Sequence, residues 1–303
     1  MAAACRSLCP RRSSAAPPRP PRHARRPRGA AADAMASPAP IRLVALDMDG
    51  TLLAPDGTLS AGAASAVAAV RAAGAEVVLA SGRPNSALAP TQKELGLSSP
   101  SVTFNGALAA YVGHDGAVGR VLRSTRLGRE AVEAVAAACG AAGAPVLWCD
   151  EEGMVATAEG PEQEALLAQF VAYDPENPPT RAASFDGLLE QGKLPLKLVA
   201  AVGSQDRAER EAAAARALLP GGTAHVIAAE IHVEFVSPCT SKWAGLEAVL
   251  EELGVSPEEV LAFGDNNNDV EMLAAAGQGV AMPNGVEAAR AAAARVAEGS
   301  NAE

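Results

Sequence analysis

The sequence predicts an α/β protein in which a parallel sheet is interrupted by an inserted α+β domain. Apolar runs of strand length alternate with helical runs in residues 41–106 and 237–303, which is typical of a doubly wound sheet. Between them, residues 107–236 contain short alternating runs joined by Asp-Gly and Glu-Gly turns, which is typical of antiparallel hairpins. With 303 residues the chain is long enough for roughly two domains of ~150 residues each.

The chain is organised around residues 41–53, where an apolar, partly β-branched run ends in two carboxylates. Apart from Arg42, both faces of this run are apolar, so we expect a buried parallel strand. Asp47 and Asp49 follow at its carboxyl end, where alternate residues point the same way, and Gly50 allows a turn. Two carboxylates held close together repel, so the pair requires a cation or a shared proton. An ordinary strand with an Asp-Gly turn is the alternative, and the later motifs decide against it.

The elements that follow continue a β-α-β-α-β pattern. Residues 55–59 contain a second Asp-Gly-Thr-Leu without a preceding strand, and we interpret them as a turn. Ser60 caps a helix that extends to about residue 73, where Gly74 ends it. Strands are expected at 76–80 and 101–104, with a further helix starting at Pro84, directly after Ser81-Gly82-Arg83.

The segment 107–236 is expected to form an α+β domain inserted between two core segments, 41–106 and 237–303. Its predicted strands are 108–112, 117–123, 146–149, 154–158, 196–202, 225–228 and 231–236. Its predicted helices are 129–142, 161–173 and 205–219. Residues 174–181 are Pro-rich and are expected to be a loop.

The second core segment resumes the alternation of strands and helices. We expect helices at 242–253, after residue 269 to about 275, and at 286–294, and strands at 260–263 and 279–282. The loop 264–269, rich in Asn and Asp, follows the first of these strands. It therefore lies at the carboxyl edge of the predicted parallel sheet, as do the two acids of the first strand.

Polar side chains at this edge have complementary chemistry. Asp47 and Asp265 supply the carboxylate oxygens that Mg²⁺ prefers. The Ser81 hydroxyl, the Lys242 ammonium and the Asn268 amide are groups that bind phosphate. A carboxylate beside both is a nucleophile for phosphoryl transfer, and the second acid of the first motif can protonate the leaving oxygen and later activate water. Each motif alone is weak, but four in this order are a strong indication.

These four motifs resemble those of class IIB, or Cof-like, phosphatases of the haloacid dehalogenase superfamily. They are Asp47-Met48-Asp49-Gly50-Thr51-Leu52-Leu53, Ser81-Gly82-Arg83, Lys242, and Gly264-Asp265-Asn266-Asn267-Asn268-Asp269-Val270-Glu271-Met272-Leu273. The resemblance extends from about residue 41 to the end of the sequence. It implies a Rossmann-like core with a C2-type cap between the second and third motifs, in agreement with the insert.

The resemblance also implies a role for each site residue. Asp47 is the expected nucleophile and Asp49 the expected general acid and base. The residues expected to bind the phosphoryl group are Ser81, Gly82, Arg83, Lys242 and Asn268. The cofactor Mg²⁺ is expected on Asp47, on Asp49 through its backbone carbonyl, on Asp265, and on Asp269 as a ligand or directly behind the ligands.

Two features depart from the family pattern. Trp243 stands where the family usually has Gly after the lysine of the third motif, so we expect it to crowd Lys242 or to line the entrance. The family also usually continues with one more helix after the segment that corresponds to 294–303, so we expect the C-terminal edge of the core to be less well covered.

The charge is unevenly distributed along the chain. Residues 1–40 hold eight Arg and one acid, Asp33, a net charge of +7, and the total is −10, so the remainder carries −17. An arm rich in Arg, Pro and Ser without apolar periodicity is typical of a transit peptide, with a disordered basic tail as the alternative. We expect import into the chloroplast or another plastid, with the mitochondrion as the alternative and the cytoplasm for a form that starts at Met35.

Composition also limits the partners. The acidic remainder argues against binding to nucleic acid or to anionic membranes, and no apolar run approaches the ~20 residues of a membrane span. The five cysteines are odd in number and lack metal-ligand spacing, which favours free thiols. We expect a monomer or a weak dimer.

The sequence and the resemblance together predict a Mg²⁺-dependent phosphatase that acts on a small phosphorylated metabolite through an aspartyl-phosphate intermediate. The resemblance implies a sugar phosphate, or the phosphate of a flavin or another vitamin precursor, as the substrate. The alternatives are a phosphomutase of the same fold and a non-catalytic relative that binds metabolites.

Overall fold

The computed structural model describes residues 39–173, 175 and 177–301. The chain divides into two compact units, residues 1–40 and residues 41–303, and the fold below is that of the second unit. Apart from its last two residues, the expected transit peptide lies outside the described residues.

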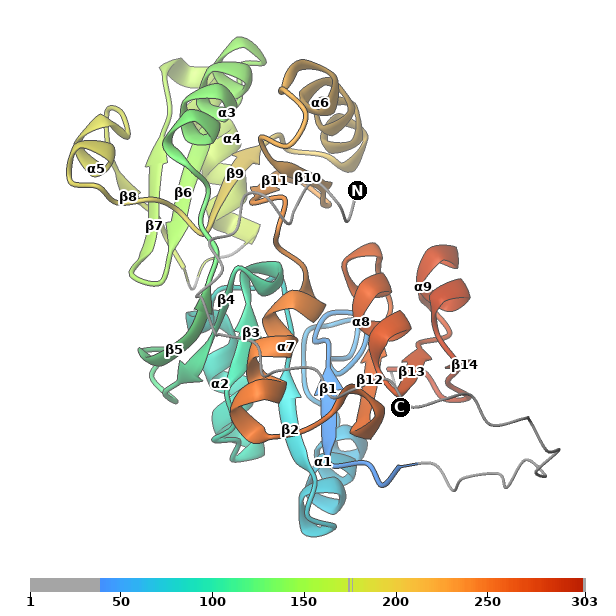
Figure 1. Cartoon of the computed structure of the whole chain (residues 1–303). Helices are drawn as coiled ribbons and strands as arrows, with labels where there is room; N and C mark the ends of the chain where they lie inside the picture. Colours follow the sequence, from blue (N-terminus) through green and yellow to red (C-terminus); the bar gives the residue numbers. More distant parts are fainter. Residues whose placement is uncertain (1–38, 174, 176, 302–303) are drawn as a thin grey trace, which may run out of the picture. The chain divides into compact units, whose positions relative to one another are not determined.

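The core is a parallel sheet with the strand order β14-β13-β12-β1-β2 (Figure 1). Its strands are β1 (Leu43–Leu46), β2 (Glu76–Leu79), β12 (Val260–Gly264), β13 (Gln278–Ala281) and β14 (Arg295–Val296). From β1 the chain moves first to β2 on one side and later to β12 and β13 on the other. The strand order therefore reverses at β1, which is where ligands bind in open α/β sheets. The predicted parallel α/β core is confirmed.

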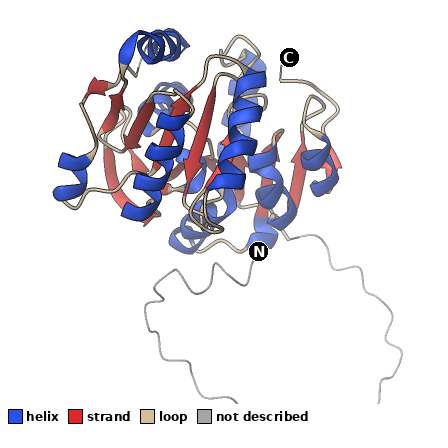
Figure 2. Cartoon of the chain, turned by 90° about the horizontal axis from the view of Figure 1, so that it is seen from above, coloured by secondary structure: helices blue, strands red, loops and turns tan. Residues whose placement is uncertain are grey.

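Both faces of β1 are buried, as its continuous apolar run predicts. Leu43 and Ala45 belong to one hydrophobic cluster, and Val44 and Leu46 belong to another. The alternation follows from the two-residue period of a strand. The cluster of Val44 and Leu46 also contains residues of α1 (Ala61–Ala72) and α2 (Asn85–Leu95). The cluster of Leu43 and Ala45 also contains residues of α7 (Lys242–Leu253), α8 (Val270–Ala275) and α9 (Glu287–Ala292) (Figure 2).

A three-stranded antiparallel sheet belongs with the core. It consists of β3 (Ser101–Thr103), β4 (Leu108–Val112) and β5 (Val118–Ser124). A parallel bridge between Ala80 and Val102 links β3 to the core sheet, and α7 contacts all three strands. The sequence assigned this hairpin to the insert from residue 107 onward, whereas the structure pairs it with β3. A hairpin pattern shows that two strands pair with each other but does not show which third strand they join. The expected domain limits 41–106, 107–236 and 237–303 stay a prediction.

The rest of the expected insert forms a six-stranded sheet with the order β10-β11-β9-β6-β7-β8. Its strands are β6 (Val146–Asp150), β7 (Gly153–Thr157), β8 (Thr180–Arg181), β9 (Lys197–Ala201), β10 (His225–Ala228) and β11 (His232–Val236), and its helices are α3 (Arg129–Ala141), α4 (Gly160–Tyr173), α5 (Asp186–Glu190) and α6 (Gln205–Leu218). In the central strand β9, Leu198 and Ala200 pack with residues of α3 and α6, while Val199 and Ala201 pack with residues of α4.

Among the α-helices and strands of the described residues, β8, α5 and β14 were not predicted. β8 lies in the Pro-rich stretch that was expected to be a loop, and pairs with β7. β14 pairs with β13 at the C-terminal edge of the core, where weaker coverage was expected. Among the described residues, no helix combines the length and apolar character needed to cross a membrane.

Candidate active site

Asp47 stands at the carboxyl end of β1 and is held there by the neighbouring strand. Its N–H donates to the carbonyl oxygen of Phe263 at 3.1 Å, and the residue is only 4% exposed. Gly50 then turns the chain at a φ of +78°, where a Cβ atom would overlap the Asp265 carboxylate. Glycine is therefore required here both for the backbone angle and for the close approach of the two loops.

Lys242 is the buried cation of the site and is the first residue of α7. The helix is capped by Ser241, whose Oγ accepts a hydrogen bond from the N–H of Ala244 at 3.2 Å. The Lys242 ammonium donates to Asp47 Oδ1 at 2.5 Å and to Asp269 Oδ1 at 2.7 Å. Burial by itself lowers the pKa of Lys242, but Asp269 and Asp47 raise it above its usual value. The lysine therefore stays charged although it is only 1% exposed.

Trp243, the unusual neighbour of Lys242, lies against the core. Its side chain packs, together with Leu122 of β5, on the hydrophobic cluster that contains Leu43. Lys242 keeps both carboxylate partners. The expected crowding of the lysine is therefore not observed, because the indole packs on that cluster.

Asp269 organises the loop of the fourth motif. Its Oδ2 accepts hydrogen bonds from the N–H groups of Asp265 and Asn266, both at 3.0 Å, while Oδ1 accepts from Lys242. Asp269 is fully buried. Because protein donors engage both of its oxygens, this carboxylate shapes the loop and holds the lysine, and it fits better behind a metal ion than on it.

Asp265 lies across the loop from the first motif and is more accessible. Thr51 Oγ1 donates to Asp265 Oδ1 at 3.5 Å, and Asn284 Nδ2 lies 3.4 Å from Asp265 Oδ2. Asn284 also donates to the carbonyl oxygen of Gly50 at 2.9 Å. These contacts join the first motif, the fourth motif and the loop after β13. The sequence interpretation had not singled out Thr51 or Asn284 individually.

Lys242 alone does not balance the negative charge of the acids around it, and the pKa values of Asp47 and Asp265 are raised. Burial, reinforced by the nearby charges of Asp269 and Asp265, raises the pKa of Asp47 well above its usual value, although Lys242 opposes the shift. Burial and the charge of Asp269 likewise raise the pKa of Asp265, while a hydrogen bond to Asp47 opposes the shift. The sequence predicted the need for a cation or a shared proton for Asp47 and Asp49, whose side chains were expected to point the same way. That pairing is wrong, because Asp49 binds Arg83 and the acids grouped with Asp47 are Asp265 and Asp269.

A divalent cation fits this arrangement. Carboxylate oxygens of Asp47, Asp265 and Asp269 lie within 4.8 Å of one another, and oxygen ligands are those that Mg²⁺ prefers. Since Asp269 already accepts three hydrogen bonds, Asp47 and Asp265 are the residues that would hold the ion. The Asp49 carboxylate is outside this group, so only its backbone carbonyl remains as the ligand that the family resemblance implies.

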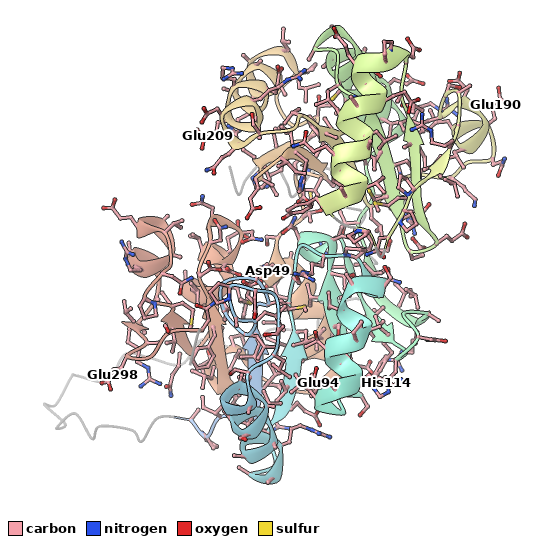
Figure 3. The ribbon with its side chains drawn as sticks, turned by 180° about the vertical axis from the view of Figure 1, so that it is seen from behind. Asp49, Glu94, His114, Glu190, Glu209 and Glu298 are labelled. Atoms are coloured by element: carbon pink, nitrogen blue, oxygen red, sulfur yellow. The ribbon has the colours of Figure 1, made fainter. Side chains whose placement is uncertain are left out.

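Asp49 points away from the cluster toward Arg83. Arg83 donates from Nε to Asp49 Oδ2 at 2.8 Å and from Nη2 to Oδ1 at 2.5 Å, a bidentate pair. The two side chains are 55% and 37% exposed, for Asp49 and Arg83 respectively. Figure 3 shows Asp49 at the end of the core that faces the six-stranded sheet. Arg83, expected on the phosphate, thus holds the expected general acid in this structure.

Ser81 and Gly82 begin the second motif, just after the end of β2. Ser81 is 1% exposed, and its Oγ accepts a hydrogen bond from the N–H of Arg83 at 3.1 Å. A side chain at Gly82 would collide with Asn105, and the Gly82 carbonyl oxygen accepts a hydrogen bond from Lys197 at 3.2 Å. Gly82 is therefore contacted both by Asn105 and by Lys197 of β9.

Asn268 is connected to the insert through residues that sequence reasoning missed. Its Nδ2 donates to Asn105 Oδ1 at 2.9 Å, and Asn105 Nδ2 donates to Glu234 Oε2 at 2.6 Å. Glu234 forms a buried ion pair with Lys197. Asn105 itself has a φ of +58°, an uncommon conformation for a non-glycine residue that is often found at functional sites.

A sequence signal for this connection did exist. Lys197 lies inside the otherwise apolar run 196–202, and Glu234 lies with His232 inside the run 231–236. Buried charges are normally paired. Burial alone would raise the pKa of Glu234, but the charges of Lys197 and His232 lower it far below its usual value. The sequence does not show which charges pair, because the partners come from different strands.

The chain was compared with known proteins. The sequence profile of the haloacid dehalogenase-like hydrolases matches residues 44–303. The 5-amino-6-(5-phospho-D-ribitylamino)uracil phosphatase YitU of Bacillus subtilis is 29% identical over 265 residues, covering 82% of this chain and 88% of YitU. The pyridoxal phosphate phosphatase YbhA of Escherichia coli is 29% identical over 254 residues, covering 82% of this chain and 90% of YbhA.

A solved structure has the same fold. The subclass IIB sugar phosphatase BT4131 superimposes with a TM-score of 0.68, over 84% of this chain and 92% of BT4131, at 23% identity. At this identity the likeness to BT4131 shows a shared fold. The alignments with YitU and YbhA each cover 82% of the chain.

Proposed function

We propose a function from the premise that this chain belongs to the haloacid dehalogenase-like hydrolases, as a class IIB phosphoric monoester hydrolase. Its reaction is the Mg²⁺-dependent removal of phosphate from a small metabolite through an aspartyl-phosphate on Asp47. The observation that supports this most directly is the buried cluster in which Lys242 joins Asp47 to Asp269, with Asp265 beside them. We call these four residues the acid–lysine cluster.

The reaction proceeds in two steps on the residues described. An oxygen of Asp47 attacks the phosphorus atom, a bond to phosphorus forms, and the ester oxygen leaves with its electron pair. Asp49 gives that oxygen a proton and then takes one from the water that hydrolyses the aspartyl-phosphate, which releases orthophosphate. Lys242 fixes Asp47 and offsets negative charge throughout. Asp47 and Asp265 would hold Mg²⁺, which would supply further positive charge to offset that of the phosphoryl group.

The pair between Asp49 and Arg83 fits this role for Asp49. Both side chains are more than a third exposed. Water can therefore solvate each of them when Asp49 turns from Arg83 to the leaving oxygen. Ser81, Gly82, Lys242 and Asn268 border the place where the phosphoryl group is bound in this proposal.

The names of the relatives support a finer choice of substrate. YitU is named for a phosphorylated ribitylaminouracil and YbhA for pyridoxal phosphate, whereas BT4131 is named a sugar phosphatase. The first two cover the chain at higher identity. We therefore favour the phosphate of a vitamin precursor over a sugar phosphate.

Metal dependence tests the proposal. We expect a chelator to abolish phosphate release from phosphate monoesters and added Mg²⁺ to restore it. Asp265→Asn should weaken the apparent affinity for Mg²⁺, whereas Asp206→Asn, at an exposed position on α6, should not. Full activity in excess chelator would contradict the proposal.

The basic arm leads to a separate proposal about location. Its +7 charge and its Arg, Pro and Ser content support import into a plastid. A fluorescent fusion of residues 1–40 is expected to enter plastids. Uptake by mitochondria, or retention in the cytosol, would refute the plastid assignment.

A further inference from the structure

Asn284 lies in the turn after β13 and connects the two loops that carry the expected metal ligands. Its Nδ2 donates to the carbonyl oxygen of Gly50 at 2.9 Å and lies 3.4 Å from Asp265 Oδ2. Both neighbours are acceptors, and a side-chain amide has two N–H donors on its nitrogen and none on its oxygen, so the nitrogen must face them. One side chain therefore bridges the first and the fourth motif, although it belongs to neither.

The turn that carries Asn284 is itself fixed against the fourth motif. The N–H of Val286 donates to the carbonyl oxygen of Asp265 at 2.8 Å, and a Cβ atom at Gly285 would come within 2.9 Å of that same oxygen. From α9, Arg290 donates through Nη1 to the carbonyl oxygen of Gly285. The side chain of Asn284 therefore extends from a backbone whose position beside Asp265 is set by the core.

The two carboxylates expected to hold Mg²⁺ differ in how firmly they are held. Asp47 is 4% exposed, and its Oδ1 accepts a hydrogen bond from Lys242 at 2.5 Å. Asp265 is only half-buried, and Thr51 and Asn284 approach its two oxygens at 3.5 and 3.4 Å. Because Mg²⁺ demands near-ideal octahedral geometry, the affinity of the site depends on what orients the less restrained of the two acids.

We propose that Asn284 is a positioning residue for the divalent cation: its amide nitrogen holds Asp265 at the spacing from the first motif that the cation requires. This inference rests on the proposed function and adds a residue that sets the metal affinity of the same site. The Gly50 carbonyl comes directly after the Asp49 carbonyl, the backbone ligand that the family resemblance implies, so the same nitrogen also steadies that turn. Loss of a hydrogen-bond partner behind the ligands typically weakens metal binding about 10–100-fold.

The test measures metal binding directly, on the full chain without substrate. Mn²⁺ is the probe, because carboxylate, carbonyl and water ligands suit it as they suit Mg²⁺, and the electron paramagnetic resonance signal of free Mn²⁺ gives the dissociation constant. Asn284→Ala should weaken Mn²⁺ binding about tenfold. Asn284→Leu, which keeps the volume of the side chain without a donor, should have the same effect.

Kinetics then separate metal affinity from chemistry. With p-nitrophenyl phosphate, the Mg²⁺ concentration that gives half-maximal activity should rise about tenfold in both Asn284 variants. Their kcat at saturating Mg²⁺ should fall less than about threefold, because the site is then occupied in every protein. Unfolding temperatures measured without metal should match that of the wild type, since Asn284 is exposed and surface substitutions usually change stability little.

Asn301 provides the matched control. Its Nδ2 donates to the carbonyl oxygen of Leu53 at 2.8 Å. It therefore makes the same kind of bond to the same motif, but to the last residue of that motif instead of Gly50. Asn301→Ala should leave the dissociation constant for Mn²⁺ within about twofold of the wild-type value.

Metal binding by the wild type separates this inference from the proposed function. If the wild type binds Mn²⁺ and requires Mg²⁺ while Asn284→Ala binds Mn²⁺ equally well, the inference is wrong and the proposed function stands. An equal loss in Asn301→Ala would also overturn the inference, as would a loss of kcat at saturating Mg²⁺ with unchanged Mn²⁺ affinity. If the wild type neither binds Mn²⁺ nor requires Mg²⁺, the proposed function itself is wrong and the inference fails with it.

Discussion

Buried lysines pair with carboxylates at two places in the described part of the chain, one in the core and one in the insert. In the core, Lys242 donates to Asp47 and Asp269, and Asp265 lies close by. In the insert, Lys197 pairs with Glu234. Three carboxylates thus share one ammonium in the acid–lysine cluster, whereas the second pair is balanced and His232 lies near it.

The imbalance has a visible consequence. Burial raises the pKa of Asp47 despite Lys242, while Lys197 and His232 lower the pKa of Glu234 despite burial. A buried lysine–carboxylate pair therefore goes with a raised carboxyl pKa in the core and a lowered one in the insert, depending on how many acids share the lysine. The core cluster is suited to accept one more positive charge, and the insert pair is suited to hold Asn105 and the loop of Gly82 in place.

The largest expected effect comes from the two acids of the first motif. Asp47→Asn should remove the phospho-enzyme and reduce turnover to the background rate, because the nucleophile is lost. Asp49→Asn should slow turnover by about 10²–10⁴-fold, the range of general acid–base catalysis. With an activated leaving group that needs no proton, the Asp49 variant should accumulate phospho-enzyme. Acid quench and mass spectrometry locate the phosphate, and label on Ser or His would contradict the assignment.

Lys242→Met should reduce kcat by about 10²–10³-fold, since it removes the positive charge that fixes Asp47 and offsets the charge that develops in the reaction. Steady-state kinetics measure the effect. Lys193→Met is the matched control, because Lys193 pairs with Glu152 at 2.8 Å but is 41% exposed. A loss of less than tenfold at Lys242 would show that the cluster works without its lysine.

Glu234→Leu should lower the free energy of unfolding by about 3–5 kcal/mol, because the buried Lys197 is left without its partner. It should also raise KM, since Asn105 loses the acceptor that orients it toward Asn268. Glu234→Gln keeps an oxygen for Asn105 and should spare KM while it still costs stability. Calorimetry and kinetics separate the two effects.

The control for Glu234 is Glu152→Gln, at the surface pair with Lys193. It should change the unfolding temperature very little. Equal losses at the two sites would show that burial does not distinguish these pairs.

The smallest expected effect is a pH dependence of stability. The pKa of Glu234 is lower in the folded chain than its ordinary value of about 4.3. Its stabilising contribution should therefore be complete above about pH 5 and decline as the pH falls toward the folded-state pKa. Denaturation curves of the wild type and Glu234→Gln should converge as the pH is lowered from 6 to 3. A difference that stays constant over this range would contradict the lowered pKa.

Much of the local structure could be predicted because its signals lie next to each other in the chain. The helix expected at 242–253 is observed as α7, capped by Ser241 and ended by Gly254 at a φ of +61°. Ser60 likewise caps α1. The clustering of Asp47 and Asp265 was predictable for a similar reason: both follow apolar strands, and the ends of parallel strands meet at one edge of a sheet.

Short elements escaped prediction because two residues show no periodicity. β8 and β14 have two residues each, and they are strands only because β7 and β13 offer them backbone partners. The hairpin of β4 and β5 was predicted, but its pairing with β3 was not. Its apolar faces suit any hydrophobic neighbour, and α7 is that neighbour only in the folded chain.

The sequence alone thus determined the parallel core, the edge of the sheet at which its polar motifs lie, and the acids and lysine that meet there. The tertiary structure alone decided that Arg83 binds Asp49, that Asp269 supports the loop, and that Asn105 connects Asn268 to the insert. Asn105 and Glu234 are 129 positions apart in the chain. Whether such distant polar groups meet depends on how two sheets are placed against each other, and side-chain contacts at that range have no signature in local periodicity.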